Sequence, residues 1–196
     1  MKSIFVDFDG VVIDSEPWHL KSYQALIERM GKELTASQFS NLYMGRSERE
    51  IVSAMELNYD IQIDYDSFSR QRDEIIKTYI KAKSIPIMGN VQAYLRQFSS
   101  TPRFILSSQS KEIIELTLEV YRIGGFEGIF SAPELGKGKQ RIAMDRVQFG
   151  DLIIDDNIKF LLSCRDLTDR LLYVRHSMNS DVDESIETLH GRGVGS

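Results

Sequence analysis

The segment FVDFDGVVIDSEPWH, residues 5–19, decides the fold class expected for this chain of 196 residues. The six residues 3–8, SIFVDF, form a short and partly β-branched apolar run, which is typical of a buried strand. The run ends in two carboxylates, Asp7 and Asp9, which flank Phe8 and directly precede Gly10. Aspartate before glycine is also common in an ordinary solvated turn. Whether Asp7 and Asp9 belong to a functional site therefore depends on which polar groups the rest of the chain places near them.

Four later segments resemble the first and predict further buried strands. They are residues 103–108, 127–132, 151–156 and 170–176. Stretches of helical period separate them, including residues 111–123 and 139–147. Strands that alternate with helices predict an α/β protein with a parallel sheet that is covered on both faces.

Residues 15–84 interrupt this alternation and predict an inserted helical lobe. Apolar residues recur at helical spacing after Ser15, a candidate N-cap, and Pro17 falls in the first turn, where its missing N–H costs little. A second helix is predicted around residues 75–80, and no strand pattern of similar strength lies between the two. We therefore expect a core from residues 1–14 and 85–196, with a helical lobe from residues 15–84.

Composition and charge narrow the classes of function. Hydrophobic residues make up 42% and charged residues 27% of the chain, and no apolar run approaches the ~20 residues of a membrane span. A net charge of −5 argues against nucleic acid and anionic membranes as partners. The single cysteine, Cys164, excludes an internal disulfide and is expected to be buried. We expect a cytoplasmic protein, and its oligomeric state is left open.

Polar groups suited to phosphate and metal follow four of the predicted strands. They are Asp7 and Asp9, Ser107 and Ser108, Lys137 and Lys139, and Asp155 and Asp156. Because ligands bind at the carboxyl ends of the strands in an open parallel sheet, these groups are expected to meet at one edge. Carboxylate oxygens suit a hard cation such as Mg²⁺. One carboxylate could then attack a bound phosphoryl group while a second transfers the proton.

The stretch DFDGVVIDSE resembles the signature of the haloacid dehalogenase superfamily, and the serine, lysine and acidic-pair elements occur in the family's order. The resemblance implies a Rossmann-like parallel-sheet core with an inserted all-helical cap. It implies Asp7 as the nucleophile and Asp9 as the general acid/base. Ser107 and Lys139 would bind the phosphoryl group, with Lys137 the poorer match to the family lysine. A Mg²⁺ site would use Asp7, the backbone carbonyl of Asp9, Asp155 and Asp156.

The helical lobe resembles the cap of the subgroup that contains phosphoglycolate phosphatases and β-phosphoglucomutases. DSEPWH and MGRSERE match its hinge and its substrate-facing loop, and His19 falls where the phosphomutases have a histidine. Two departures are present: Asn157 and Lys159 follow the acidic pair where another aspartate is usual, and Gln140 follows the lysine in place of proline. Neither removes one of the primary groups.

The expected function is a Mg²⁺-dependent phosphatase that acts on a small phosphorylated metabolite through an aspartyl phosphate. One alternative is a β-phosphoglucomutase-like phosphomutase of the same fold, which shares every core residue named above. Another is a non-catalytic signalling or partner-binding module that binds phosphate and Mg²⁺, against which the intact Asp7 and Asp9 count. His176 and His190 show no metal-ligand spacing with His19 and are expected to lie outside the site.

Overall fold

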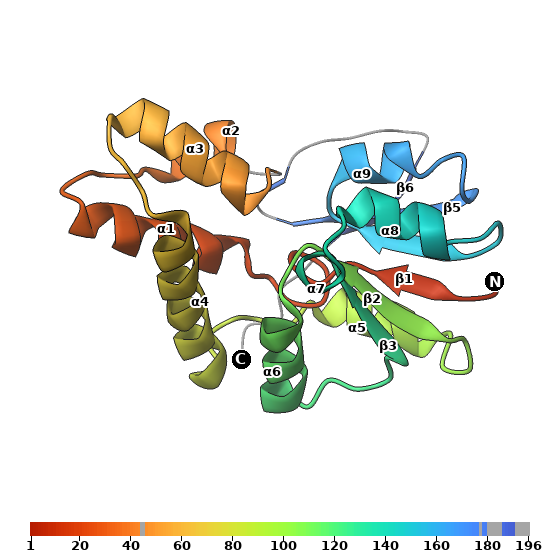
Figure 1. Ribbon diagram of the computed structural model, residues 1–196. Helices are drawn as coiled ribbons and strands as arrows, with labels where there is room; N and C mark the ends of the chain where they lie inside the picture. Colours follow the sequence, from red (N-terminus) through yellow and green to blue (C-terminus); the bar gives the residue numbers. More distant parts are fainter. Residues whose placement is uncertain (44–45, 177, 180–185, 191–196) are drawn as a thin grey trace. The chain divides into compact units, whose positions relative to one another are not determined.

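The computed structural model describes residues 1–43, 46–176, 178–179 and 186–190 (Figure 1). It divides into two compact units. Met1–Ser15 and Ile85–Ser196 form the first, and Glu16–Ser84 form the second. The first unit contains the sheet, and the described residues of the second form helices and their connections.

The first unit is built on a six-stranded parallel sheet in the order β3-β2-β1-β4-β5-β6. The strands are β1 (Ile4–Val6), β2 (Arg103–Ser107), β3 (Gly128–Ser131), β4 (Leu152–Asp155), β5 (Arg170–Arg175) and β6 (Glu187–His190). The first five correspond to the five predicted strands, so the predicted fold class is confirmed. The edge strand β6 was not predicted, because ETLH has neither an apolar run nor clear alternation.

Helices cover both faces of this sheet (Figure 1). Figure 1 shows α5 (Gly89–Arg96) and α6 (Lys111–Tyr121) on one face, and α8 (Lys139–Arg146) and α9 (Ile158–Ser163) on the other. The short α7 (Ala132–Leu135) follows β3 directly. On the α8 and α9 side, Phe5, Ile153 and Tyr173 pack in one buried cluster with Ile142 and Leu161. Since side chains alternate along a strand, Asp7 and Asp155 lie on the same side as Phe5 and Ile153.

The second unit comprises α1 (Glu16–Arg29), α2 (Ala36–Leu42), α3 (Glu48–Tyr59) and α4 (Tyr65–Lys81). Its core includes three aromatic side chains: the ring centroid of Tyr23 lies 5.7 Å from that of Phe39 and 6.1 Å from that of Phe68. Capping boxes at Thr35 and Ser47 satisfy the first backbone N–H groups of α2 and α3. These two helices therefore each have a local start signal as well as a buried face.

A polar cluster is buried among α1, α3 and α4. The Arg72 guanidinium donates to Glu48 Oε1 at 3.1 Å and contacts Nδ1 of His19 at 3.0 Å. Glu48 Oε2 also accepts from the hydroxyls of Ser69 and Tyr65. These bonds join three helices around one arginine, so His19 is a buried member of the packing of this unit.

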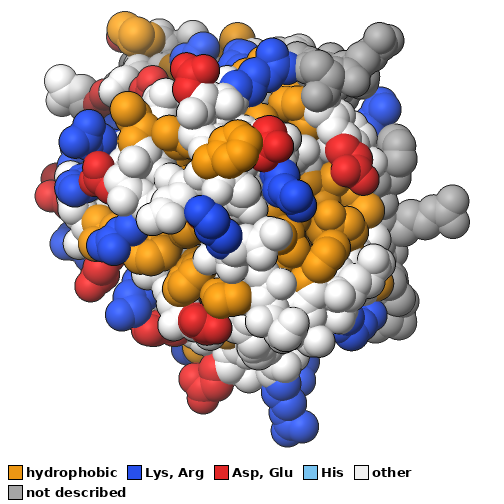
Figure 2. Space-filling model, turned by 90° about the vertical axis from the view of Figure 1, so that its right-hand side faces the viewer, with side chains coloured by type: hydrophobic (Ala, Val, Ile, Leu, Met, Phe, Trp, Pro, Cys, Tyr) orange, Lys and Arg blue, Asp and Glu red, His pale blue; other side chains and the backbone are white. Residues whose placement is uncertain are grey.

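The surface mixes charges of both signs with separate hydrophobic patches, as the face in Figure 2 shows. Phe149 and Leu57 are the most exposed large hydrophobic side chains of the described residues, at 71% and 84%. No helix in the described part of the chain is long and apolar enough to cross a membrane.

Candidate active site

The candidate site lies where the direction of the strand order reverses. The chain runs from β1 to β2 and β3 on one side, and from β4 to β5 and β6 on the other, so β1 and β4 meet at the switch point. The carboxyl ends of the strands at such a point are the usual ligand site in open α/β sheets. Asp7 follows β1, and its N–H donates to the carbonyl of Ile154 at 2.9 Å, which brings Asp7 beside Asp155.

Asp7 is buried and firmly held. Its Oδ1 accepts the N–H of Phe8 at 2.7 Å, and its Oδ2 lies 2.6 Å from the Lys139 ammonium. Burial, and then the charge of Asp155, keep the pKa of Asp7 well above its ordinary value, although Lys139 lowers it. The Asp7 carboxylate is thus held in place beside other negatively charged groups that one lysine only partly neutralises.

Asp155 and Lys139 form the second part of the site. Lys139 begins α8 and donates to Asp155 Oδ2 at 2.6 Å, while Asp155 Oδ1 accepts the N–H of Asn157 at 2.8 Å. Burial raises the pKa of Asp155 to about 6 despite the lysine. Burial alone would lower the pKa of Lys139, but Asp155 and Asp7 together raise it above its ordinary value. One ammonium group therefore bridges two buried carboxylates.

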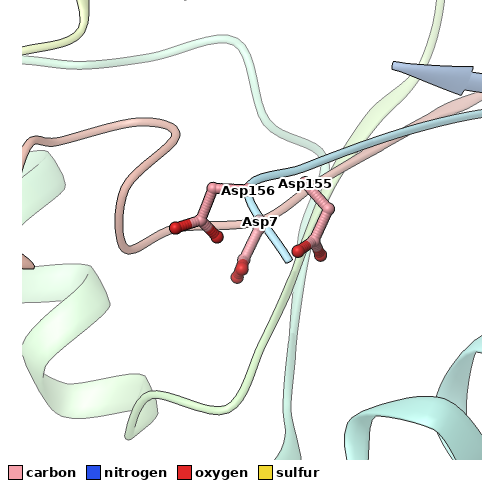
Figure 3. Close-up of side chains that lie close together, drawn as sticks. All are labelled: Asp7, Asp155 and Asp156. Atoms are coloured by element: carbon pink, nitrogen blue, oxygen red, sulfur yellow. The ribbon is translucent and has the colours of Figure 1, made fainter. Parts of the chain in front are cut away.

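Asp156 completes a cluster of three carboxylates with Asp7 and Asp155, and ligand atoms of all three lie within 4.8 Å of one another. Figure 3 shows the three carboxyl groups turned toward the same side of β1 and β4. Oδ2 of Asp156 lies 2.9 Å from Nε2 of His176. Gly10 passes so close that a Cβ atom there would lie 2.3 Å from Asp156 Oδ2, and its φ of +71° favours glycine as well.

The donor set fits a hard divalent cation. Three carboxylates lie close to one another and Lys139 bridges two of them, so negative charge exceeds positive charge in this cluster of side chains. Burial is the main cause of the raised pKa values of Asp7 and Asp155, and the charge of neighbouring carboxylates adds to it. Oxygen ligands in this arrangement are those that Mg²⁺ or Mn²⁺ prefers, whereas a soft metal would require sulfur or more nitrogen.

Asp9 lies next to this cluster in sequence, but its carboxylate has different partners. Its Oδ1 accepts the Ser15 hydroxyl at 2.7 Å, and its Oδ2 accepts from the Gln109 side-chain amide at 3.4 Å. Ser15 directly precedes α1, where an N-cap was predicted, yet the bond found for its hydroxyl is the one to Asp9. The use of the Asp9 carbonyl as a metal ligand stays a prediction.

Ser107 ends β2 at the same edge of the sheet and is 1% exposed. Its hydroxyl accepts the backbone N–H of Gln109 at 3.0 Å, which shapes the loop before α6. Lys137, the other predicted lysine, instead pairs with Asp145 at 2.9 Å on the surface. The geometry therefore places Lys139, and not Lys137, among the carboxylates.

The family model for haloacid dehalogenase-like hydrolases matches residues 4–143, which is well over half of the chain. The chain belongs to this family. The matched span begins in β1 and ends in α8, so it includes Asp7, Asp9, Ser107 and Lys139. No curated protein is significantly similar to the chain.

Solved structures of haloacid dehalogenase-like proteins share the fold at low identity. CbbY from Rhodobacter sphaeroides, in complex with phosphate, is 11% identical with a TM-score of 0.77, over 96% of this chain and 92% of that one. A protein assigned as a β-phosphoglucomutase from Thermotoga maritima is 16% identical with a TM-score of 0.69, over 97% and 94%. One assigned as a phosphoglycolate phosphatase from Lactobacillus plantarum is 15% identical with a TM-score of 0.69, over 88% and 86%.

Two buried residues of this haloacid dehalogenase-like chain escaped the sequence interpretation. His176 was expected to lie outside the site, and the structure corrects this, because its ring contacts Asp156. His176 directly follows β5, so the rule about carboxyl ends of strands could have identified it. Gln109 contacts Asp9 from the loop after β2, close in sequence to the predicted Ser107 and Ser108. The side chain of His190 and the loop residues Met44 and Gly45 lie outside the described part of the chain.

Proposed function

We propose that this protein is a Mg²⁺-dependent phosphatase that hydrolyses a small phosphorylated metabolite through a phosphoenzyme intermediate on Asp7. The observation that carries the proposal is the position of Asp7 at the switch point of the sheet, between the Lys139 ammonium and two further carboxylates. The chain belongs to a hydrolase family, and one protein of the same fold is assigned as a phosphatase, which supports the same class of reaction. The phosphate bound to CbbY, a protein of this fold, is consistent with it.

In the first step, an Asp7 carboxylate oxygen attacks phosphorus in line with the leaving oxygen. The new Asp7 O–P bond forms as the P–O bond to the leaving group breaks, and Asp9 donates a proton to the departing alkoxide. Lys139 stabilises the negative charge on the transferred phosphoryl group, and Ser107 binds one of its oxygens. We assign Oδ2 of Asp7 as the attacking oxygen, because Oδ1 accepts the N–H of Phe8 and Oδ2 lies beside the lysine that would attract the phosphoryl group.

In the second step, water attacks the phosphorus of the aspartyl phosphate. Asp9, now a carboxylate, takes the proton of that water, and the bond between Asp7 and phosphorus breaks to release inorganic phosphate and the original carboxylate. The bonds from Ser15 and Gln109 orient Asp9 for both proton transfers. Asp9 therefore ends the cycle protonated and ready to act again as the acid.

Mg²⁺ would be held by Asp7, Asp155 and Asp156, with the Asp9 carbonyl as a further ligand, and would supply charge neutralisation and alignment for the phosphoryl group. Without that charge, an incoming phosphate would meet the excess of carboxylates. The helical unit Glu16–Ser84 would serve as the cap that excludes water and selects the substrate.

Phosphate release from p-nitrophenyl phosphate tests the proposal directly. We expect turnover by the intact protein that requires Mg²⁺ and disappears in Asp7→Asn, which keeps the size of the side chain but removes the nucleophile. Lys137→Met is the control, because Lys137 lies on the surface with Asp145. Equal turnover by Asp7→Asn and the intact protein would contradict the assignment of Asp7.

A further inference from the structure

We propose that His176 is a positioning residue that holds the Asp156 carboxylate in place for a divalent cation. The inference rests on the proposed function, since it concerns the same cation, but it assigns a role to a residue outside the predicted site. It starts from one contact: Nε2 of His176 lies 2.9 Å from Oδ2 of Asp156. The His176 side chain is 2% exposed, so this bond is shielded from water.

The hydrogen bonds of the ring fix its tautomer. The backbone N–H of Met178 donates to Nδ1 of His176 at 3.3 Å, so Nδ1 acts as an acceptor and carries no proton. The proton of a neutral ring is then on Nε2, from which it is donated to Asp156. His176 thus supplies a directed donor to Asp156 without the charge of an imidazolium.

Asn179 fixes the backbone on both sides of this bond. Its Oδ1 accepts the N–H of His176 at 2.8 Å, and its Nδ2 donates to the carbonyl of Asp156 at 3.2 Å and to that of Val174 at 3.1 Å. One asparagine therefore ties the end of β5 to the residue after β4. Gly10 lies beside the same oxygen, Oδ2 of Asp156, and its missing side chain leaves room for the carboxylate and the ring.

This restraint counters the repulsion within the site. Asp156 lies close to Asp7 and Asp155. Among the ion pairs of the described residues, Lys139 pairs with Asp7 and Asp155, whereas Asp156 pairs with His176. A carboxylate that is repelled by two others turns away unless a donor holds it. His176 is that donor, and its bond engages Oδ2, which leaves Oδ1 for a cation. Partners of metal ligands act in this way in general, and their loss costs about 10- to 100-fold in affinity.

Two substitutions separate the bond to Asp156 from the rest of the histidine. In His176→Asn, the amide oxygen can replace Nδ1 as the acceptor for Met178, but the side chain is too short to reach Asp156. In His176→Gln, the amide nitrogen can occupy the position of Nε2 and donate to Asp156. Both are smaller or more flexible than histidine, so they share any loss of packing.

The test is a titration of the metal-free proteins with Mn²⁺, followed by the electron paramagnetic resonance signal of the free ion, with Mg²⁺ as competitor. We expect His176→Asn to raise the Kd about 10- to 100-fold and His176→Gln to stay within about threefold of the intact protein. Thermal unfolding of the metal-free proteins shows that both variants are folded at the temperature of the titration; we expect His176→Asn to melt below His176→Gln, because it alone loses the hydrogen bond to Asp156.

Unchanged Mn²⁺ affinity in folded His176→Asn would overturn the inference while leaving the proposed function intact. Equal loss of affinity in both variants would also overturn it, because the bond to Asp156 would then not be the cause. If the intact protein itself binds no Mn²⁺ or Mg²⁺, the cation requirement of the proposed function fails, and the role of His176 fails with it.

Discussion

Gly10→Ala should destabilise this protein far more than an equally left-handed glycine elsewhere, because its new methyl group would displace Asp156. The φ of +71° at Gly10 costs an L-residue about 1–2 kcal/mol. In addition, the methyl carbon would lie 2.3 Å from Oδ2 of Asp156 and 3.1 Å from Nε2 of His176, too close for either to remain. The hydrogen bond between His176 and Asp156 would be lost. A hydrogen bond to a charged group contributes about 1.5–3 kcal/mol, so this loss roughly doubles the destabilisation caused by the backbone alone.

Gly136→Ala is the matched control for this substitution. Gly136 lies in the same compact unit and has a φ of +59°, but a Cβ there would meet no atom within 4 Å. It therefore carries the backbone cost alone. At about 2–4 °C per kcal/mol for a chain of this size, Gly10→Ala should melt about 3–12 °C below Gly136→Ala.

Circular dichroism melts of the metal-free variants measure this difference, and Mn²⁺ titrations add a second readout. We expect Gly10→Ala to weaken Mn²⁺ binding, since Asp156 is displaced, and Gly136→Ala to leave it unchanged. Equal melting temperatures and equal Mn²⁺ affinities for the two variants would refute the packing of Asp156 against Gly10.

Further predictions concern the lysine, the buried arginine and pH. Lys139→Met should lower phosphatase turnover at least about 100-fold, whereas Lys137→Met should leave it within about twofold; steady-state kinetics decides. Glu48→Gln should cost about 2–3 kcal/mol in urea unfolding, because it breaks the pair with a buried arginine, while Asp145→Asn on the surface should leave the urea midpoint nearly unchanged. Burial raises the pKa of Asp155 from 3.8 to about 6. This group therefore stabilises the metal-free protein below pH 3.8, and its contribution to the free energy of unfolding is lost as the pH rises to about 6. Stabilisation by Mg²⁺ should show the reverse trend in melts with and without the ion, growing above about pH 6; a Mg²⁺ shift of the same size at pH 5 would contradict this.

Sequence patterns predicted the parallel sheet and the meeting of the carboxylates at one edge, because both depend on local signals. Apolar runs marked the strands, and their polar ends had to meet once the strands were parallel. That reasoning brought Asp7, Asp155 and Asp156 to one edge, where the structure places them within 4.8 Å. It also favoured Lys139 over Lys137 by resemblance, and the ion pairs of the two lysines agree with that order.

The contacts that hold the site together were beyond such patterns. The bond between His176 and Asp156 joins residues 20 positions apart, and that between Gln109 and Asp9 joins residues 100 apart. A histidine or glutamine has no sequence signal for a partner at such separation, because the contact depends on how two loops pack. Ser15 carries a local signal for a helix cap, but that signal does not predict the bond that its hydroxyl donates to Asp9.

The central claim is that Asp7 becomes phosphorylated during turnover. The most direct measurement is intact-protein mass spectrometry after acid quenching of the protein mixed with p-nitrophenyl phosphate and Mg²⁺, followed by borohydride reduction to locate the modified residue. The account predicts a protein heavier by one phosphoryl group, with the modification at Asp7, and no such species in Asp7→Asn or without Mg²⁺. Phosphate release by the intact protein with no phosphorylated Asp7 at any quench time, and undiminished release by Asp7→Asn, would contradict it.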